Sequence, residues 1–136
     1  MKVSPYLIFN GNCVEAIALY EKAFNTKASY CQYKDTPPSE EYPVRPGTEE
    51  LVMHGTLPVG TGTIYLADTT PDQPVTFSHC VVICVELDTA EDVRAAFDVL
   101  KEGGKVLCAV QETFWSKCYA ELEDRFGLKW GIMVEE

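Results

Sequence analysis

The stretch NCVEAIALYEKAF, residues 12–24, has the pattern of an amphipathic helix. Its apolar side chains recur at helical spacing, whereas Glu15, Glu21 and Lys22 fall on other faces. The Asn12 side chain can accept hydrogen bonds from the free amides of the first turn, and Glu15 completes an arrangement like a capping box. The sequence therefore predicts a helix that begins at Asn12 and continues to residue 24.

A second stretch of this kind, TAEDVRAAFDVLKE, covers residues 89–102. Either Thr89 or Asp88 can cap its start, and the glycine pair 103–104 stops it. Placing Tyr20 over Phe97, an offset of 97 minus 20 or 77 residues, aligns the two helices along their length. The chain therefore contains two similar halves.

Each predicted helix is preceded by one β-rich run and followed by three, so both halves read βαβββ. We expect an α+β fold with one domain over residues 1–136, made of a first module at about residues 1–70 and a second at about 75–136. The proline-rich stretch 34–47 is expected to be a surface loop, and residues 68–74 a linker. The β-rich runs are residues 3–9, 27–33, 50–57 and 61–67 in the first half, and 76–87, 105–110, 117–122 and 128–134 in the second.

Composition and charge exclude several classes of function. An apolar share of 46% and a charged share of 24% are typical of soluble globular proteins. The formal net charge of -10 would repel a phosphate backbone, so nucleic acid is not an expected partner. No apolar run approaches the roughly 20 residues that span a bilayer, and no secretory signal is recognisable. We therefore expect a cytoplasmic protein with no membrane association.

The cysteines predict buried, reduced thiols, because they lie in apolar periodic segments without an export signal. Cys80 and Cys84 would lie too far apart on one strand to share a structural zinc ion. Only Cys13, at a helix start, has a setting that can activate a thiolate, but its place on the apolar stripe favours burial. The six cysteines are residues 13, 31, 80, 84, 108 and 118.

Several strings, taken in order and spacing, resemble the PhnB-like branch of the glyoxalase/bleomycin-resistance/dioxygenase (vicinal oxygen chelate) superfamily across nearly the whole chain. The resemblance implies two βαβββ modules whose sheets each form half of a cup-shaped mixed sheet, with helices outside and a ligand cavity inside. It also implies a homodimer. The strings are YLIFNGNCVEAIALYEKAF (6–24), HGTLPVGTGTIYLAD (54–68), the helix before GGKV (103–106), QETFW (111–115) and DRFGLKWGIM (124–133).

In metal-using relatives, a divalent ion takes His, Gln or Glu ligands from the first and last strands of the modules and acts as a Lewis acid. Hard or borderline cations require such oxygen and nitrogen ligands to converge on one point. Carried over to this chain, these positions hold almost no side chain that can coordinate. They fall near Pro5, Val82, Gly131 and Leu66 or Ala67, with Asp68 just beyond.

His79 is a substitute ligand to consider. It lies three residues from Val82, and an odd offset in a strand places its side chain on the opposite face. We therefore expect no metal site and no other cofactor, and a chain that folds without a divalent ion.

His54 lies in the apolar run LVMHGTL, where a polar side chain must find a partner or face a cavity. It is a candidate catalytic acid or base, and a structural histidine is the alternative. The resemblance places a histidine at this point in many relatives. Asp68 can pair with His54 as a ligand-binding residue, or begin the turn toward Pro71.

The string QETFW combines polar groups with large aromatic rings beyond a strand, a composition suited to a pocket for a small polar-aromatic ligand. We take Gln111 and Trp115 as candidate ligand-binding residues and Glu112 as a candidate catalytic partner of His54. The alternative is that the aromatic rings close the edge of the cup or an interface between subunits. Tyr6 is expected to lie in the core or in the cavity wall, where it would contact the ligand.

Two hypotheses of function follow. In the first, the protein binds a small organic molecule in the cup without a metal, as antibiotic-sequestering relatives do. In the second, it is a lyase, isomerase or dioxygenase-type enzyme that uses His54 and Glu112, or a divalent metal site with another ligand set. PhnB-like proteins also carry the label demethylubiquinone methyltransferase, but no glycine-rich loop for S-adenosylmethionine is present. Motifs for hydrolases and nucleotide-binding enzymes are absent as well.

Overall fold

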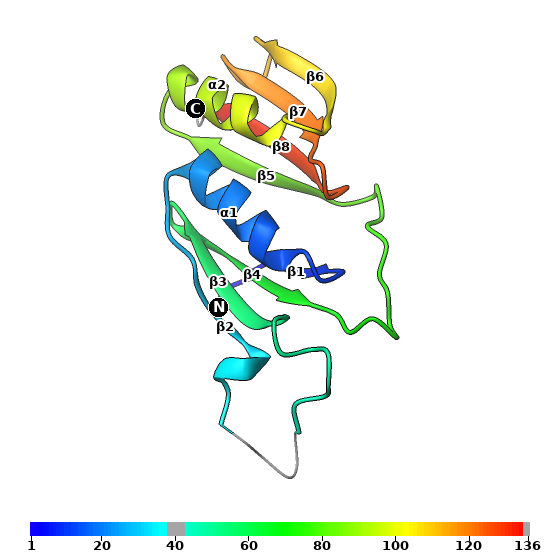
Figure 1. The fold of residues 1–136 in the computed structure, drawn as a ribbon. Coiled ribbons are helices and arrows are strands. Elements are labelled where there is room, and N and C mark those ends of the chain that lie inside the picture. Colours follow the sequence, from blue (N-terminus) through cyan, green and yellow to red (C-terminus); the bar gives the residue numbers. More distant parts are fainter. Residues whose placement is uncertain (38–42, 135–136) are drawn as a thin grey trace. The chain divides into compact units, whose positions relative to one another are not determined.

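A computed structural model describes residues 1–37 and 43–134 of the chain (Figure 1). The chain forms two compact units. The first consists of Met1–Glu21 and Thr26–Thr76, and the second of Lys22–Asn25 and Phe77–Glu136. Each unit contains a four-stranded sheet. The architecture is α+β and confirms the two predicted βαβββ modules.

The sheet of the first unit has the strand order β1-β4-β3-β2. β1 and β4 run parallel, and the other neighbours are antiparallel, so the sheet is mixed. The helix α1 connects β1 to β2 along the chain. The elements are β1 (Tyr6–Phe9), α1 (Cys13–Phe24), β2 (Ser29–Gln32), the short 3-10 helix η1 (Tyr33–Asp35), β3 (Val52–Val59) and β4 (Gly62–Asp68).

α1 packs on one face of this sheet through its apolar stripe, whose residues Cys13, Ala16 and Ile17 are buried. The ring of Tyr20 lies 6.4 Å from that of Phe9, measured between centroids. Period-2 alternation divides each strand between a face under the helix and a face that the helix leaves uncovered. The buried side chains under the helix include Leu7, Phe9, Leu57, Ile64 and Leu66.

The second unit repeats this topology, with the strand order β5-β8-β7-β6 and a parallel β5–β8 pair. The helix α2 lies against β5, β7 and β8. Its N-cap is Thr89, one of the two residues that the sequence allowed, and its side chain accepts from the Asp92 amide at 3.1 Å. The elements are β5 (Val82–Leu87), α2 (Ala90–Leu100), β6 (Lys105–Gln111), β7 (Tyr119–Glu123) and β8 (Lys129–Val134).

The core under α2 also follows the predicted stripe. Val93, Ala96 and Leu100 are fully buried on the helix side. On the sheet side, Trp130 is fully buried, and its indole N–H donates to Asp124 at 2.9 Å. The buried apolar surface of such side chains is the main contribution to the stability of each unit.

The opening strand of each half is shorter than the sequence predicted. β1 begins at Tyr6 because Pro5 has no amide hydrogen, although its carbonyl still accepts from the Tyr65 amide at 2.9 Å. β5 begins at Val82 because its neighbour β8 begins at Lys129, the residue opposite. The segment 76–81 therefore precedes the sheet and is not part of a strand.

The predicted surface loop 34–47 includes residues 38–42, which lie outside the described residues. Of the rest, residues 34–35 belong to η1 and residues 43–47 contain no strand or helix. Among residues 1–37 and 43–134, no helix has the length and apolar character needed to cross a bilayer. The cytoplasmic location inferred from the sequence stays a prediction.

Candidate functional site

The uncovered face of the first sheet carries a cluster of three rings. The hydroxyl of Tyr6 lies 3.0 Å from Nδ1 of His54. The ring centroids are 5.6 Å apart for Tyr6 and His54, 5.4 Å for His54 and Tyr65, and 5.8 Å for Tyr6 and Tyr65. We call Tyr6, His54 and Tyr65 the first aromatic cluster. It joins β1, β3 and β4, because Tyr6 and Tyr65 are directly opposite in the parallel pair.

The cluster is partly exposed to solvent. His54 is exposed, Tyr6 is 49% exposed and Tyr65 is half-buried. The pKa of Tyr6 is raised above its usual value, mainly by partial burial and to a smaller extent by the ionisable groups of Tyr33 and Cys13. The Tyr6 hydroxyl therefore keeps its proton at physiological pH and acts as a hydrogen-bonding phenol.

Asp68 does not belong to this cluster. Its carboxylate accepts from the amides of Gly11 at 2.9 Å and Cys13 at 3.1 Å through Oδ1, and from the Val52 amide at 3.0 Å through Oδ2. The side chain is buried. Both oxygens thus hold the backbone at the start of α1 and of β3, and His54 pairs with Tyr6 instead, so a ligand-binding role of Asp68 stays a prediction. The Cys13 amide finds its acceptor in Asp68, 55 residues along the chain.

The remaining predicted site residues lie in the second unit. Trp115 is 47% exposed and forms edge contacts with Phe114 and Tyr119, whose ring centroids lie 4.7 and 5.3 Å away. Gln111 is exposed, and its amide donates to Cys108 Sγ at 3.0 Å. Glu112 is exposed. His54 belongs to the first unit, whereas Glu112 and Trp115 belong to the second. The predicted pairing of His54 with Glu112 therefore stays a prediction, as does the cavity shared by His54 and Trp115.

Two polar residues beside Trp115 were not among the predicted site residues. Tyr119 and Glu121 lie on the uncovered face of the second sheet, and the Tyr119 hydroxyl donates to Glu121 Oε2 at 3.2 Å. Alternation in YAELE, residues 119–123, places both side chains on one face, but only the fold shows that the helix leaves this face uncovered. Tyr65 was likewise missed, because its position opposite Tyr6 depends on the parallel pairing of distant strands.

The positions that correspond to metal ligands do not suit a metal ion. Gly131 has no side chain, and a Cβ atom placed there would lie 3.4 Å from Cys84 Sγ and 3.5 Å from Val82 Cγ1. With the Tyr119 hydroxyl at 3.6 Å, these neighbours are a thiol, an alkyl group and a phenol, and they include no imidazole, amide or carboxylate donor. Within residues 1–37 and 43–134, no group of three or more His, Cys, Asp or Glu side chains has a geometry that could hold an ion. We therefore derive no reaction step through a metal.

His79 has a partner in the protein. Its Nε2 lies 2.6 Å from Oε1 of Glu123. The residue lies in the segment before β5 and not in a strand, so the expectation that strand alternation sets the direction of its side chain is wrong. The pair ties this segment to β7.

All six cysteines are free thiols, but the expectation that all would be buried is wrong. Cys13 and Cys118 are buried, whereas Cys80 and Cys84 are exposed. Burial, together with the nearby charge of Asp68, raises the pKa of Cys13 to about 12, so the thiol at the helix start is not activated. Burial, then the charges of Glu121 and Glu86, raises the pKa of Cys84. Its thiol also stays protonated.

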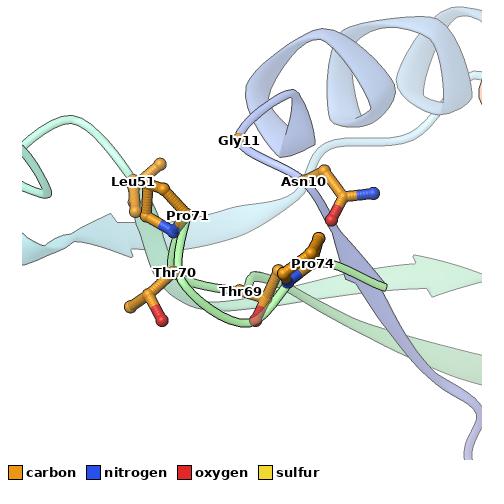
Figure 2. Close-up of a pocket in the computed structure, with 7 residues that line it drawn as sticks. All are labelled: Asn10, Gly11, Leu51, Thr69, Thr70, Pro71 and Pro74. Carbon is orange, nitrogen blue, oxygen red and sulfur yellow. The ribbon is translucent and has the colours of Figure 1, made fainter. Parts of the chain in front are cut away.

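A separate pocket of about 210 Å³ lies at the C-terminal ends of β1 and β4 (Figure 2). Its polar side chains are already used within the protein. The amide of Asn10 bonds both the N–H and the C=O of Val75 at 2.8 Å, and the Thr69 hydroxyl donates to the Gln73 carbonyl at 2.8 Å. None of the predicted site residues lines it. The lining residues are Asn10, Gly11, Leu51, Thr69, Thr70, Pro71 and Pro74.

Comparison with known proteins identifies the family. The model of the family described as 3-demethylubiquinone-9 3-methyltransferase matches residues 1–133. The protein YjdN of Escherichia coli K12 is 29% identical in an alignment 146 residues long, which covers 98% of this chain and 95% of YjdN. The crystal structure of PA1353 from Pseudomonas aeruginosa is similar with a TM-score of 0.83 and 29% identity, over 99% of this chain and 98% of that one.

More distant structures share the fold. A PhnB protein from Bacillus cereus has a TM-score of 0.76 at 22% identity, over 99% of this chain and 100% of that one. The fosfomycin resistance protein FosX from Mesorhizobium loti has a TM-score of 0.62 at 10% identity, over 98% and 92% of the two chains. With two βαβββ units and a family match over almost its whole length, the chain belongs to the 3-demethylubiquinone-9 3-methyltransferase family, and it shares its fold with the PhnB protein and with FosX.

Proposed function

We propose that this protein binds a small organic molecule, without a metal ion, on the uncovered face of the first sheet. The observation that carries the proposal is the hydrogen bond between the Tyr6 hydroxyl and His54 Nδ1, on a face that α1 leaves open. A polar pair flanked by aromatic rings is the usual composition of a small-molecule site, because the rings supply contact area and the polar groups fix the orientation of the ligand.

The chemistry of the pair defines what a ligand must offer. If the Tyr6 hydroxyl donates to Nδ1, then the His54 Nε2 carries the ring proton, and the pair presents one donor and the phenol lone pair outward. If Nδ1–H donates to the phenol oxygen, then Nε2 is an acceptor and the phenol proton is the outward donor. Either tautomer of neutral His54 therefore offers one donor and one acceptor. A ligand with a hydroxyl or amide beside an aromatic or alkyl group would satisfy both.

The enzyme hypothesis is the second candidate, and the same hydrogen bond supports it. Tyr6 orients the imidazole of His54, as a general acid or base requires. In this hypothesis His54 and Glu112 move a proton in a lyase, isomerase or dioxygenase-type reaction. The name of the family describes a methyl transfer, but it is the name of a family and no motif in this chain supports that activity.

Thermal-shift screening of the purified protein against a panel of polar-aromatic metabolites tests the proposal, since a ligand that binds only the folded state raises the melting midpoint. For a compound that does so, Tyr6→Phe should weaken binding roughly 3- to 10-fold through the loss of one hydrogen bond. His54→Ala should weaken it at least as much. Adding EDTA should leave the midpoint unchanged.

Glu112→Gln separates the two hypotheses. A binding protein should keep its affinity in this variant, whereas an enzyme that uses Glu112 should keep the affinity and lose turnover of the compound. A ligand whose affinity is unchanged in both Tyr6→Phe and His54→Ala would contradict the proposed site. A large fall of the midpoint with EDTA, together with near-stoichiometric zinc, nickel, iron or manganese by elemental analysis, would contradict the metal-free proposal.

We also propose that the protein is a homodimer. Supporting this, β6 is an edge strand of its sheet and exposes Val106 by 46% and Leu107 by 40%. Apolar edge strands are commonly covered by another chain. Light scattering at tens of micromolar protein should give twice the mass of the 15.2 kDa chain. A mass equal to one chain under these conditions would show that the subunit is monomeric.

A further inference from the structure

Four residues form a row across the uncovered face of the second sheet. Cys84 on β5 is opposite Gly131 on β8, Gly131 is opposite Glu121 on β7, and Glu121 is opposite Cys108 on β6. The carboxylate of Glu121 is therefore flanked on one side by a glycine and on the other by a thiol. It is half-buried, so it has lost part of its hydration.

Glu121 belongs to no ion pair in the part of the chain that the structure describes. Its described side-chain partner is the Tyr119 hydroxyl at 3.2 Å. Glu123, two residues along the same strand, differs. It pairs with His79, and its opposite residues are Lys105 and Lys129. Of these two carboxylates of β7, Glu123 thus has basic side chains beside it, whereas Glu121 lies between a glycine and a thiol.

The charge of Glu121 affects its neighbours. Burial first, then the charge and hydrogen bond of Glu121, raises the pKa of Tyr119 to about 12. Burial, followed by the charges of Glu121 and Glu86, raises the pKa of Cys84. Both groups stay protonated, so neither Tyr119 nor Cys84 adds a negative charge beside Glu121.

The ring of Tyr119, whose hydroxyl bonds Glu121, belongs to a group of aromatic side chains. Trp115 meets Tyr119 edge to face, with ring centroids 5.3 Å apart and planes at 76°. Phe114 extends the group, its centroid 4.7 Å from that of Trp115. Because Trp115 is 47% exposed, part of its ring surface remains available. The faces of such rings attract cations, and tryptophan does so most strongly.

We infer that Trp115, Tyr119 and Glu121 form a site for an alkylammonium group of a small organic molecule. The rings would contact the alkyl groups around the nitrogen, and Glu121 would supply the opposite charge. This inference goes beyond the proposed function, which concerns Tyr6 and His54 on the other sheet, and it does not depend on that proposal.

The probe pair is choline and 3,3-dimethylbutan-1-ol, which have nearly the same shape but differ in charge. Trp115 and Trp130 are the two tryptophans of the chain, and Trp130 is fully buried, so a change of fluorescence on titration reports mainly on Trp115. Choline should change the fluorescence in a saturable way that weakens with added salt. The neutral alcohol should give no saturable change.

Glu121→Gln keeps the shape of the side chain and removes its charge. Choline should bind at least about tenfold more weakly to this variant, as expected for the loss of a charged contact. Glu123→Gln is the matched control, because this carboxylate is on the same strand and already has a cationic neighbour, and it should change the affinity less than about twofold. Trp115→Leu, followed by thermal shift, should abolish the stabilisation by choline.

Equal binding of choline and the neutral alcohol would overturn the inference, as would unchanged affinity in Glu121→Gln. An equal loss in Glu123→Gln would also overturn it, since the effect would then come from the overall negative charge. His54→Ala should retain the choline response. Loss of the response in His54→Ala with retention in Glu121→Gln would assign the binding to the first aromatic cluster and contradict the site proposed on the second sheet.

Discussion

Replacing Asp68 by alanine should lower the free energy of unfolding by about 3–5 kcal/mol, one of the largest effects that a single substitution can have in this chain. The carboxylate accepts three backbone hydrogen bonds, from the amides of Gly11, Cys13 and Val52. Alanine would leave these donors without acceptors at a buried position, and each unsatisfied buried group costs about 1–3 kcal/mol. The effect is measured by urea denaturation of the wild type and the variant.

Asp68→Asn is the control for size and shape. The amide oxygen can still accept from Gly11 and Cys13, but the amide nitrogen would face the Val52 amide, a donor against a donor. We expect this variant to lose roughly half as much stability as Asp68→Ala. A loss below about 1 kcal/mol for Asp68→Ala would show that water or local rearrangement satisfies these amides, and that Asp68 does not anchor α1 to β3 and β4.

The second large effect concerns the two tryptophans. Trp130→Ala should lower the free energy of unfolding by about 3–5 kcal/mol, the usual range for removing a large aromatic side chain from a core. The side chain is fully buried, its ring lies 5.3 Å from that of Phe24 between centroids, and its N–H donates to the buried Asp124. The variant would therefore lose apolar burial and leave a carboxylate oxygen without one of its partners.

Trp115→Ala is the matched control, because the same chemical change occurs at a position that is 47% exposed. It should change the free energy of unfolding by no more than about 0.5–1 kcal/mol. Urea denaturation followed by circular dichroism is suitable, since it does not depend on tryptophan fluorescence. Equal losses in the two variants would mean that Trp115 is buried in solution, for example in an interface between subunits, and no longer available to a ligand.

Local sequence patterns predicted the two halves well. Apolar residues at helical spacing placed α1 and α2, and of the two candidate caps of α2, Thr89 and Asp88, the structure shows Thr89. Alternation placed each strand to within a few residues, apart from β1 and β5. These features depend on neighbouring residues in the chain, so a single sequence contains the information.

The candidate site was harder to predict, because its members meet through pairing of distant strands. The sequence did suggest His54, Tyr6 and Trp115 as candidate site residues, because each is a polar or large aromatic residue in or beside a predicted strand. Tyr65 was missed because only the parallel register of β1 and β4 brings it opposite Tyr6. The bonds of Asp68 to the backbone were not predicted because its three amide partners lie 16 to 57 residues away in the chain.

By itself, the sequence determined the βαβββ repeat, the apolar stripe of each helix and the absence of coordinating side chains at Pro5, Val82 and Gly131, because all of these depend on residue type and short-range spacing. The tertiary structure alone decided which carboxylates are available. The Asp68 carboxylate accepts hydrogen bonds from backbone amides, and Glu123 pairs with His79. Glu121, by contrast, lies opposite a glycine and a cysteine on the neighbouring strands. The reason is that hydrogen-bond partners and cross-strand neighbours are set by register, which a strand's own residues do not specify.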